Sequence, residues 1–491
     1  MSGFPFDTVL VANRGEIALR ILRTVRKLGL RGAIVHHAID ANSVAVTAAD
    51  VAIELQGDTP GAAYLDGNRI IEKALAHGVG AIHPGYGFLS ENGAFARAVT
   101  SAGLIFVGPD PDTIDLMGDK IRARAFVSAQ GLPVPPSAIE SDSPADFEER
   151  ACAIGTPLVI KPAAGGGGKG MRIVRDLSDF HEELERARSE GKRFFGDARV
   201  YVERYIERPR HIEVQVLGDA SGNVVHFFER ECSIQRRFQK IVEESPSPAL
   251  SDPGRTQICG AAVDIARRAG YRNAGTVEFI WSEGRFYFLE MNTRIQVEHP
   301  VTEEITGIDL IAEQLRVAAG ETLGYQQGDI SRTGHAIELR LCAEEPARGF
   351  TPAVGRLLAY QPPPGVRVDS GVASGDRITT AFDPMLAKII VHGGDRLQAI
   401  ERARSALDAF VVLGCATNAS FLRRLLDNAD FIAGDVHTHF VEDNPALTNA
   451  LPIPDATRIE LLGLAARALK PICAAADAVP PMHAAMKTWR N

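Results

Sequence analysis

The sequence predicts a mixed α/β fold that opens with a parallel sheet and continues with antiparallel strand pairs. Near the N-terminus, apolar runs at residues 8–12 and 33–37 flank a segment with helical spacing of apolar residues, which is the βαβ pattern of a parallel sheet. Residues 289–298 alternate between apolar and polar residues, and residues 276–281, before the turn Ser282-Glu-Gly284, resemble the partner strand of a hairpin. The third observation is a glycine-rich loop between two short strand patterns, at residues 162–170.

We expect residues 1–115 to form the parallel-sheet domain. The helix after the first strand places Ile17, Ile21 and Val25 on one face and ends at Gly29. The turn before this helix contains one glycine and lacks GxGxxG spacing, so a dinucleotide site is not expected there. The pattern continues with strands near 50–55 and 104–107 and a helix over 67–77.

Residues 116–333 are predicted to form a second unit, with a small mobile lid at about 135–205. A proline-rich link precedes the lid, and glycines hinge its strands. Five of the six residues from Gly165 to Gly170 are glycine, which costs backbone entropy on folding and lets bare N–H groups approach an anion. This loop lies between two strands and does not match a Walker A motif. We therefore expect it to close over phosphates from above; a flexible loop without a ligand is the alternative.

The most informative stretch is residues 285–300, because polar and apolar residues alternate along most of it. We expect one strand through Glu298, with apolar or β-branched residues at the odd positions from 289 to 297. The alternative is a strand whose polar face is merely solvated. A solvated face rarely mixes two acids, an arginine and two amides without a break. The polar face would consist of Glu290, Asn292, Arg294, Gln296 and Glu298.

The partner strand adds another acid to this face. If Trp281 pairs with Tyr287, Glu278 lies opposite Glu290. Directly opposed carboxylates repel each other, so we expect a cation between them. An oxygen-rich site with two carboxylates suits Mg²⁺ held against phosphates.

Two further features of the middle unit have both a structural and a functional interpretation. Lone lysines are usually solvated, but beside a glycine-rich loop and two carboxylates Lys120 and Lys161 become candidates for phosphate contacts. The closely spaced charges of residues 229–240 are most simply interpreted as a surface turn.

Residues 334–447 are predicted to form a third unit, which begins with an alternating strand over 335–341. Helices over 396–411 and 418–427 follow, and residues 448–491 form an alanine- and proline-rich tail without an assigned role. The strand has two unlike faces, one with Ile337, Leu339 and Leu341 and the other with Glu338 and Arg340.

Composition narrows the class of protein. The 491 residues carry a net charge of −9, which argues against a nucleic-acid-binding protein. The six cysteines form no CxxC pair, so neither a zinc site nor a disulfide framework is expected, and their use fits a reducing compartment. The sequence shows no signal peptide and no apolar run of membrane-spanning length. We expect a cytoplasmic protein with neither a nucleic-acid nor a membrane partner.

Several motifs, in the same order along the chain, closely resemble those of biotin carboxylases. The resemblance covers roughly residues 5–445 and implies an ATP-grasp fold with a Rossmann-like N-terminal α/β domain, a mobile glycine-rich lid and a C-terminal biotin carboxylase domain. The motifs are Ala12-Asn-Arg-Gly-Glu-Ile-Ala18, His83-Pro-Gly-Tyr-Gly-Phe-Leu-Ser-Glu-Asn92, Met117-Gly-Asp-Lys120, Lys161 with its loop, Gln235-Arg-Arg-Phe-Gln-Lys240 and Glu290-Met-Asn-Thr-Arg-Ile-Gln-Val-Glu-His-Pro300.

The resemblance also implies a role for each candidate site residue. The ATP phosphates would contact Lys120, Lys161, Gly165, Gly166, Gly167 and Gly168, and adenosine would contact Glu203, the Ile206 backbone, His211 and Gln235. Mg²⁺ or Mn²⁺ would bind Glu278 and Glu290 beside ATP, with Asn292 close by. Bicarbonate would contact Lys240, Arg294, Gln296, the Val297 backbone and Glu298, the last as general base. Arg340 would bind biotin and stabilise its enolate, which makes Glu298, Arg340, Lys240 and Arg294 the expected catalytic residues.

The implied activity is the ATP- and bicarbonate-dependent carboxylation of biotin N1′ through carboxyphosphate, as the first half-reaction of an acyl-CoA carboxylase. Ala485-Met-Lys-Thr488 resembles a biotin acceptor sequence, but only three residues follow it, so we interpret it as coincidence. We therefore expect the biotin carboxyl carrier and the carboxyltransferase to be separate chains, or domains of a longer protein that lie outside this sequence. A homodimer is a further expectation, since the family often forms dimers. The sequence does not identify the acyl-CoA.

Two other functions compete with this one. Another ATP-grasp ligase, joining an amine to an acyl phosphate, explains the loop and the carboxylates but not the run from Arg294 to Glu298 followed by Arg340. A non-catalytic, carboxylase-like assembly protein has Phe238 as its support, because the family commonly has histidine there. That departure puts in doubt one polar contact near the nucleotide, and a changed KM for ATP is the expected consequence.

Overall fold

The computed structural model describes residues 3–140, 146–163 and 170–450, together with Ala456, Ile459, Glu460 and Gly463. The chain divides into two units, residues 1–447 and 448–491, and the following description concerns the first. Gly165 to Gly168, predicted to contact phosphates, lie outside the described residues. No helix in the described ranges is long and apolar enough to cross a membrane.

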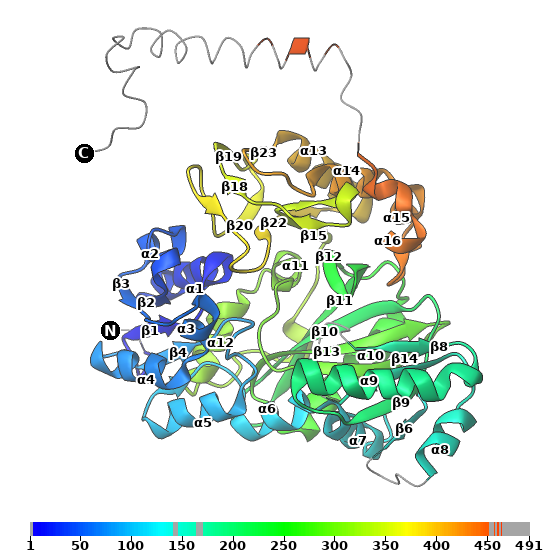
Figure 1. Cartoon of the computed structure of the whole chain (residues 1–491). Helices are drawn as coiled ribbons and strands as arrows, with labels where there is room; N and C mark the ends of the chain where they lie inside the picture. Colours follow the sequence, from blue (N-terminus) through cyan, green and yellow to red (C-terminus); the bar gives the residue numbers. More distant parts are fainter. Residues whose placement is uncertain are drawn as a thin grey trace, which may run out of the picture. The chain divides into compact units, whose positions relative to one another are not determined.

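The N-terminal part contains the predicted parallel sheet, drawn in blue in Figure 1. The predicted βαβ opening is confirmed, because β1 (Thr8–Val11) runs parallel to both β2 (Arg31–His36) and β4 (Ala81–His83). Helix α1 (Gly15–Lys27) buries Ile17, Ile21 and Val25 against this sheet, which is the face predicted from their spacing. The strand order is β3 (Val51–Glu54), β2 (Arg31–His36), β1 (Thr8–Val11), β4 (Ala81–His83) and β5 (Ile105–Phe106), and further helices include α4 (Gly67–Ala76) and α5 (Gly93–Ser101).

A second, smaller sheet lies within the range predicted as the lid. It is antiparallel, with the order β6 (Ser137–Ile139), β9 (Val200–Arg204), β7 (Leu158–Pro162) and β8 (Arg172–Val174). Helices α8 (Phe147–Ala153) and α9 (Phe180–Phe195) pack on it, and Leu158, Leu184 and Val202 belong to a hydrophobic core of its own. The hydrophobic cluster of this part is therefore distinct from those of the rest of the described chain.

The third sheet has eight antiparallel strands. It continues across residue 333, the predicted end of the second unit, because β12 (Gln239–Ser245) pairs with β15 (His335–Cys342). This pairing joins strands on both sides of that residue into one platform, seen in the centre of Figure 1. The order is β14 (Arg285–Asn292), β13 (Asn273–Ser282), β10 (Arg210–Gly218), β11 (Val224–Arg236), β12 (Gln239–Ser245), β15 (His335–Cys342), β22 (Met385–Gly393) and β20 (Arg367–Ser370).

The two faces of β15 differ as the sequence predicted. Ile337, Leu339 and Leu341 are fully buried in an apolar core with α13 (Arg396–Ala409) and α14 (Ala419–Asp427). The alternate residues Glu338 and Arg340 point to the opposite face, where α11 (His299–Thr306) also contacts the strand.

The predicted strand through Glu298 is wrong, because β14 ends at Asn292. The chain leaves the sheet where Thr293 N–H donates to a Glu91 carboxylate oxygen at 3.3 Å instead of to a neighbouring strand. Pro300 then occupies the first turn of α11, where the backbone N–H of any residue would have no partner within the helix, so its absence in proline costs no helix hydrogen bond. Burial no longer alternates past the strand end: Ile295 is fully buried in the core, but Gln296 and Glu298 are buried as well.

The predicted pairing of Trp281 with Tyr287 is also wrong by one residue, since Trp281 pairs with Phe286. A β-bulge between Glu278 and Phe279 corrects the shift, so Glu278 does lie opposite Glu290. The interpretation of residues 229–240 as a surface turn is wrong for most of their length. They form the end of β11 and the start of β12, and Glu229 and Arg230 are fully buried.

Candidate active site

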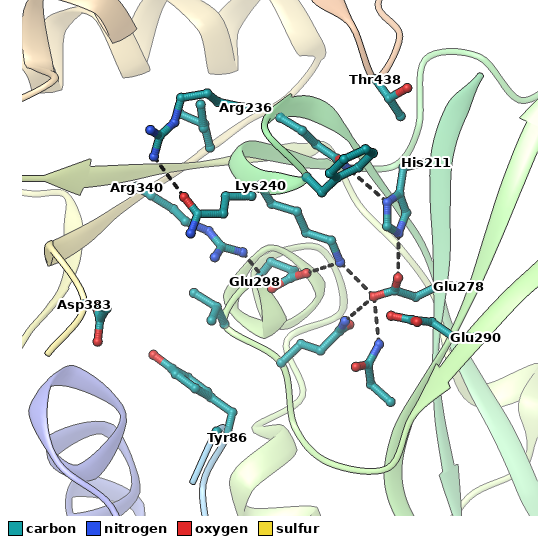
Figure 2. A pocket seen from close by; sticks show the side chains of 18 of the residues that line it. Tyr86, His211, Arg236, Lys240, Glu278, Glu290, Glu298, Arg340, Asp383 and Thr438 are labelled. Atoms are coloured by element: carbon teal, nitrogen blue, oxygen red, sulfur yellow. Dashed lines mark hydrogen bonds and ion pairs between the residues drawn. The ribbon is translucent and has the colours of Figure 1, made fainter. Parts of the chain in front are cut away.

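A cavity of about 820 Å³ lies over the polar face of the eight-stranded sheet. Its walls come from the N-terminal domain, the small antiparallel sheet, the large sheet and the C-terminal segment. Figure 2 shows Tyr86, His211, Glu278 and Arg340 directed into it from four different segments of the chain. Every described candidate residue lines this cavity: Lys120, Lys161, Glu203, Ile206, His211, Gln235, Lys240, Glu278, Glu290, Asn292, Arg294, Gln296, Val297, Glu298 and Arg340.

Glu278 has the most partners among these carboxylates. Its Oε1 accepts hydrogen bonds from Lys240 Nζ at 2.9 Å, Asn292 Nδ2 at 2.8 Å and Gln296 Nε2 at 2.7 Å. Its Oε2 lies 2.9 Å from His211 Nε2. Burial alone would raise the pKa of Glu278, but Lys240 and His211 outweigh burial and leave that pKa well below its ordinary value. Glu278 is therefore ionised and held in one orientation.

Glu278 and Glu290 lie opposite each other on paired strands, as predicted, and each has a lysine beside it. Lys120 Nζ lies 2.8 Å from Glu290 Oε2, and Lys240 Nζ lies 2.9 Å from Glu278 Oε1. Each carboxylate thus has its own cation. Their oxygen ligands fit Mg²⁺, a hard ion that prefers carboxylates together with phosphate oxygens.

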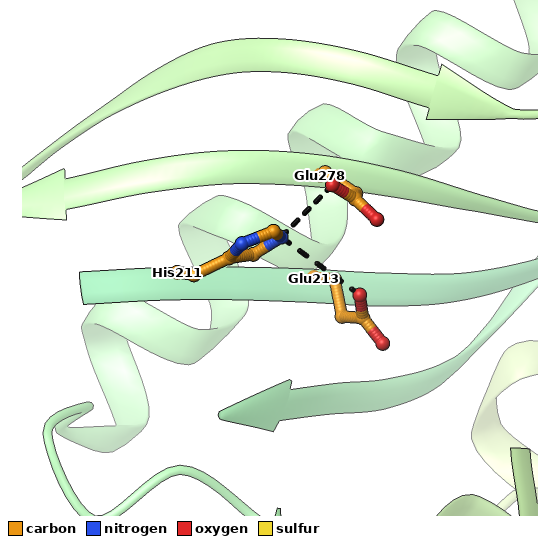
Figure 3. Close-up of side chains that lie close together, drawn as sticks. All are labelled: His211, Glu213 and Glu278. Carbon is orange, nitrogen blue, oxygen red and sulfur yellow. Dashed lines mark ion pairs between the residues drawn. The ribbon is translucent and has the colours of Figure 1, made fainter. Parts of the chain in front are cut away.

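The structure places Asn292 and Glu213 at the edges of this possible metal site. The Asn292 side-chain oxygen accepts from Arg294 Nη2 at 2.9 Å, while its amide nitrogen donates to Glu278. Figure 3 shows that His211, Glu213 and Glu278 converge, with ligand atoms within 4.8 Å of one another. The sequence analysis missed Glu213, although polar and apolar residues alternate at the start of β10 and place His211 and Glu213 on the same face.

Lys240 connects Glu278 to a second group of charges. Its Nζ lies 2.5 Å from Glu213 Oε2 and 2.7 Å from Glu298 Oε1. The second oxygen of Glu298 accepts from Arg340 Nη2 at 3.0 Å (Figure 2). Burial would raise the pKa of Glu298, but Lys240 and Arg340 outweigh it and lower that pKa. Glu298, the N-cap residue of α11, is therefore ionised between two cations.

The other predicted bicarbonate contacts lie around this pair. Arg294 Nε is 3.0 Å from Glu91 Oε2, and Gln296 Oε1 accepts from Arg230 Nη2 at 2.7 Å. Lys388, fully buried on β22, donates to the Val297 carbonyl at 2.7 Å. Sequence reasoning missed Arg230, because it lies in the charged run interpreted as a surface turn, and Lys388, because a single cation in an otherwise apolar strand carries no pattern.

At the other end of the cavity, Lys161 Nζ lies 2.6 Å from Glu203 Oε2. Gln235 Nε2 lies 2.8 Å from His211 Nδ1, so these two predicted adenosine contacts also bind each other. Phe238 sits at the tip of the β11–β12 hairpin with a φ of +65° and leaves 46% of its surface exposed in the cavity wall. Arg237 also has a positive φ, so the two residues form the turn of the hairpin, which leaves the aromatic side chain of Phe238 exposed to the cavity.

Three family models match the chain in succession. Residues 5–114 match the biotin carboxylase N-terminal domain, residues 119–326 the ATP-binding domain of the carbamoyl-phosphate synthase L chain, and residues 338–443 the biotin carboxylase C-terminal domain. Together they span most of the described residues.

Named relatives cover the same range. A biotin carboxylase from Nostoc sp. is 47% identical over 444 residues, which are 89% of this chain and 99% of that protein. A pyruvate carboxylase subunit from Methanothermobacter thermautotrophicus is 47% identical over 441 residues, covering 89% of this chain and 90% of that protein. The match spans 60% to 62% of the longer methylcrotonoyl-CoA and propionyl-CoA carboxylase alpha chains of plants and mammals.

A solved structure shows the same fold with ligands bound. The biotin carboxylase domain dimer of Hydrogenobacter thermophilus 2-oxoglutarate carboxylase, in complex with MgADP, ADP and bicarbonate, has a TM-score of 0.88 and 42% identity. The match covers 91% of this chain and 99% of that one. The chain therefore belongs to the biotin carboxylase family of ATP-dependent, ATP-grasp ligases.

Proposed function

We propose that this chain carboxylates biotin at N1′ with ATP and bicarbonate, through carboxyphosphate, as the first half-reaction of a biotin-dependent acyl-CoA carboxylase. The observation that carries the proposal is Glu298, an ionised carboxylate held between Lys240 and Arg340 at 2.7 and 3.0 Å. A base flanked by one cation for an anionic substrate and another for a developing enolate is what the two steps need.

The nucleotide occupies the end of the cavity that contains Lys161 and Glu203. Lys120 and Lys161 exchange their carboxylate partners for ATP phosphates, and the glycines from 165 to 168 complete that contact. Glu278 and Glu290, with Asn292 beside them, hold Mg²⁺ or Mn²⁺, which neutralises charge on the phosphates when it is bound. Adenosine is held by Glu203, the Ile206 backbone, His211 and Gln235.

Bicarbonate binds beside Glu298, where Lys240 and Arg294 supply positive charge and Gln296 and the Val297 backbone supply polar contacts. Glu298 accepts the bicarbonate proton, because its lowered pKa keeps it ionised at neutral pH. A bicarbonate oxygen then forms a bond to the γ-phosphorus of ATP while the bond from that phosphorus to ADP breaks. The product is carboxyphosphate.

Carboxyphosphate breaks down to CO₂ and phosphate, and the phosphate takes the N1′ proton of biotin. Arg340 places a fixed guanidinium where the negative charge of the biotin enolate develops. The enolate then forms a carbon–nitrogen bond to CO₂. Because Arg340 already contacts Glu298 at 3.0 Å, biotin and bicarbonate meet on the two sides of one ion pair.

The proposal also includes the domains, the partners and the oligomeric state of the protein. An N-terminal domain over 1–115, an ATP-grasp domain over 116–333 with its lid at about 135–205, and a C-terminal domain over 334–447 surround the cavity. A biotin carboxyl carrier and a carboxyltransferase supply biotin and use the product, in the cytoplasm. A homodimer fits the dimer described for the 2-oxoglutarate carboxylase domain.

The test is the cofactor dependence of ATP cleavage by the purified chain. With Mg²⁺, ADP release should require bicarbonate, rise on addition of free biotin and yield carboxybiotin. Cleavage that ignores bicarbonate and needs an amine acceptor would assign the site to another ATP-grasp ligase. A chain that cleaves no ATP under these conditions would be a carboxylase-like assembly protein.

A further inference from the structure

Behind Arg340 lie two carboxyl groups that the proposed reaction does not use. Glu243 on β12 and Glu338 on β15 are both fully buried. They occupy directly opposed positions of the paired strands, so their Cβ atoms are about 4.5–5.5 Å apart. Glu338 does not line the cavity. The two acids therefore form a buried pair next to the guanidinium of Arg340.

The hydrogen bonds of this pair are incomplete. Glu243 Oε1 accepts from Arg340 Nε at 2.7 Å, and Arg340 Nη2 contacts the same oxygen. Within the described residues, Glu243 Oε2 and both oxygens of Glu338 have no hydrogen-bond partner. A buried ionised carboxylate without a donor is strongly unfavourable, whereas a protonated one can donate to its neighbour.

Within the described residues Glu338 forms no ion pair, although Lys388 and Arg340 lie near enough to oppose part of the rise in its pKa. Arg340, on the same strand, already binds Glu243 and Glu298. Lys388, on the next strand, donates to the Val297 carbonyl and lies 3.3 Å from Glu16 Oε2. Lys240, on β12, is divided among Glu213, Glu278 and Glu298.

Two more titratable groups lie against this part of the sheet and supply no charge that Glu338 could use. Burial lowers the pKa of His299, at the start of α11, well below its ordinary value, so its ring is neutral. Asp369 on β20 pairs with Arg367 at 3.0 Å. Two directly opposed buried carboxyl groups, of which only Glu243 binds a guanidinium, cannot both be ionised at low cost.

We propose that Glu243 and Glu338 share a single proton and that this pair positions Arg340 for the biotin half of the reaction. Glu243 is the ionised partner that holds Arg340 Nε, and Glu338 is the neutral acid that donates to the free oxygen of Glu243. Both are positioning residues, because they act through Arg340. The proposal rests on the proposed function for its effect on biotin, but not for the shared proton itself.

The acid strengths agree with this geometry. Burial raises the pKa of Glu338 well above its ordinary value. Burial also raises the pKa of Glu243, to about 7, although Arg340 opposes the shift. Both folded-state pKa values lie above those of the unfolded chain. The pair therefore stabilises the protein least at high pH, where protons must be released, and that penalty disappears as pH falls.

The neighbouring Glu244 provides a matched control. It is buried on the same strand as Glu243, with His335 Nε2 at 2.7 Å and Arg396 Nε at 2.6 Å. Burial would raise its pKa, but His335 and Arg396 outweigh burial and lower that pKa to about 2. Glu244 is therefore ionised above the ordinary glutamate pKa, and its contribution to stability is lost only as pH falls towards 2.

The first test compares melting temperatures of the full chain from pH 5.5 to 8.5. Relative to the parent, Glu338→Gln should gain stability as pH rises, by roughly 2 °C or more at the upper end. Glu244→Gln should melt below the parent throughout this range. A Glu338→Gln variant that melts below the parent to the same extent at every pH would show that Glu338 is ionised, and would overturn the shared proton.

The second test separates positioning from packing. Glutamine at 338 can still donate to Glu243, whereas the similarly sized leucine cannot. Glu338→Leu should raise the KM for free biotin roughly tenfold while bicarbonate-dependent ATP cleavage changes little, and Glu338→Gln should restore that KM. Equal KM values for biotin in the two variants and the parent would refute the positioning role. If the parent shows no bicarbonate-dependent ATP cleavage, the proposed function fails, while the melting temperatures still decide whether the proton is shared.

Discussion

The two faces of β15 are built from alternate residues of one strand and have opposite physical character. Ile337, Leu339 and Leu341 are buried among apolar side chains under α13 and α14. Glu338 and Arg340 are also buried or nearly so, but among charges. The apolar face gains free energy from burial alone. The charged face recovers its desolvation cost only through paired groups, and a single lost partner leaves an unpaired charge.

Residues that stabilise the fold and residues that take part in the reaction therefore alternate along the same strand. Substitutions on the apolar face should change the free energy of unfolding and spare the kinetic constants. Substitutions on the charged face should change individual steps of the reaction. The following experiments test that division, in order of decreasing expected effect.

Removing the charge of Glu298 should have the largest effect. Glu298→Gln should lower the turnover of biotin carboxylation by roughly 10²-fold or more, because glutamine cannot accept the bicarbonate proton. Carboxybiotin formation at saturating substrates measures this loss. Glu283→Gln, in the exposed β13–β14 turn, is the control and should keep normal turnover. Normal turnover in Glu298→Gln would remove this residue from the role of base.

Removing the guanidinium of Arg340 should separate the two steps of the reaction. Arg340→Ala should lower kcat/KM for biotin by roughly 10²-fold, because the enolate loses its fixed cation. Bicarbonate-dependent ATP cleavage should fall much less. Both rates are measured on one preparation, with and without free biotin. An equal loss of the two would contradict the assignment of Arg340 to biotin.

On the apolar face, Leu339→Ala should lower the free energy of unfolding by about 2–5 kcal/mol, because it leaves a cavity in a fully buried core. The KM values of the folded fraction should stay unchanged. Urea unfolding measures the first quantity and steady-state kinetics the second. Leu358→Ala, at a leucine with 74% of its surface exposed, serves as the control. A raised KM without lost stability would show that the two faces are not independent.

The smallest effect is expected at Phe238. Phe238→His should lower the KM for ATP roughly two- to fivefold and leave kcat nearly unchanged, because it adds one polar group to the cavity wall. Phe194→His, at an exposed phenylalanine of α9, should leave the KM for ATP as it is. A large change in kcat would place Phe238 next to the reacting atoms instead of the nucleotide.

Sequence periodicity predicted which side chains share a face better than it predicted where elements end. The alternation from Glu290 to Glu298 identified five side chains that do line one cavity. It could not show that β14 ends at Asn292, because the loop that follows keeps the alternation of polar and apolar residue types without strand hydrogen bonds. The opposition of Glu278 and Glu290 was predicted from a register that is wrong by one residue. The β-bulge that corrects this shift has no signature in the sequence.

Buried single charges were the residues that sequence reasoning could not find. Arg230 and Lys388 are fully buried and hold Gln296 and the Val297 carbonyl in place. Arg230 lies within a run of charged residues that the sequence analysis interpreted as a surface turn, whereas Lys388 is an isolated cation in an apolar strand. The partners of both lie far away along the chain. Glu213 could have been found, because β10 alternates and His211 on the same face was recognised. The shared partners of Lys240 emerge only from three-dimensional packing.

The central claim is that the charged face activates bicarbonate by transferring the ATP phosphoryl group to it. The most direct measurement uses bicarbonate labelled with ¹⁸O and follows the label into the phosphate released, in the parent and in Arg340→Ala. Attack by a bicarbonate oxygen predicts one labelled oxygen in each phosphate formed, in both proteins. Phosphate that carries only solvent oxygen would mean that water attacks ATP directly, and would contradict the role assigned to Glu298 and its neighbours.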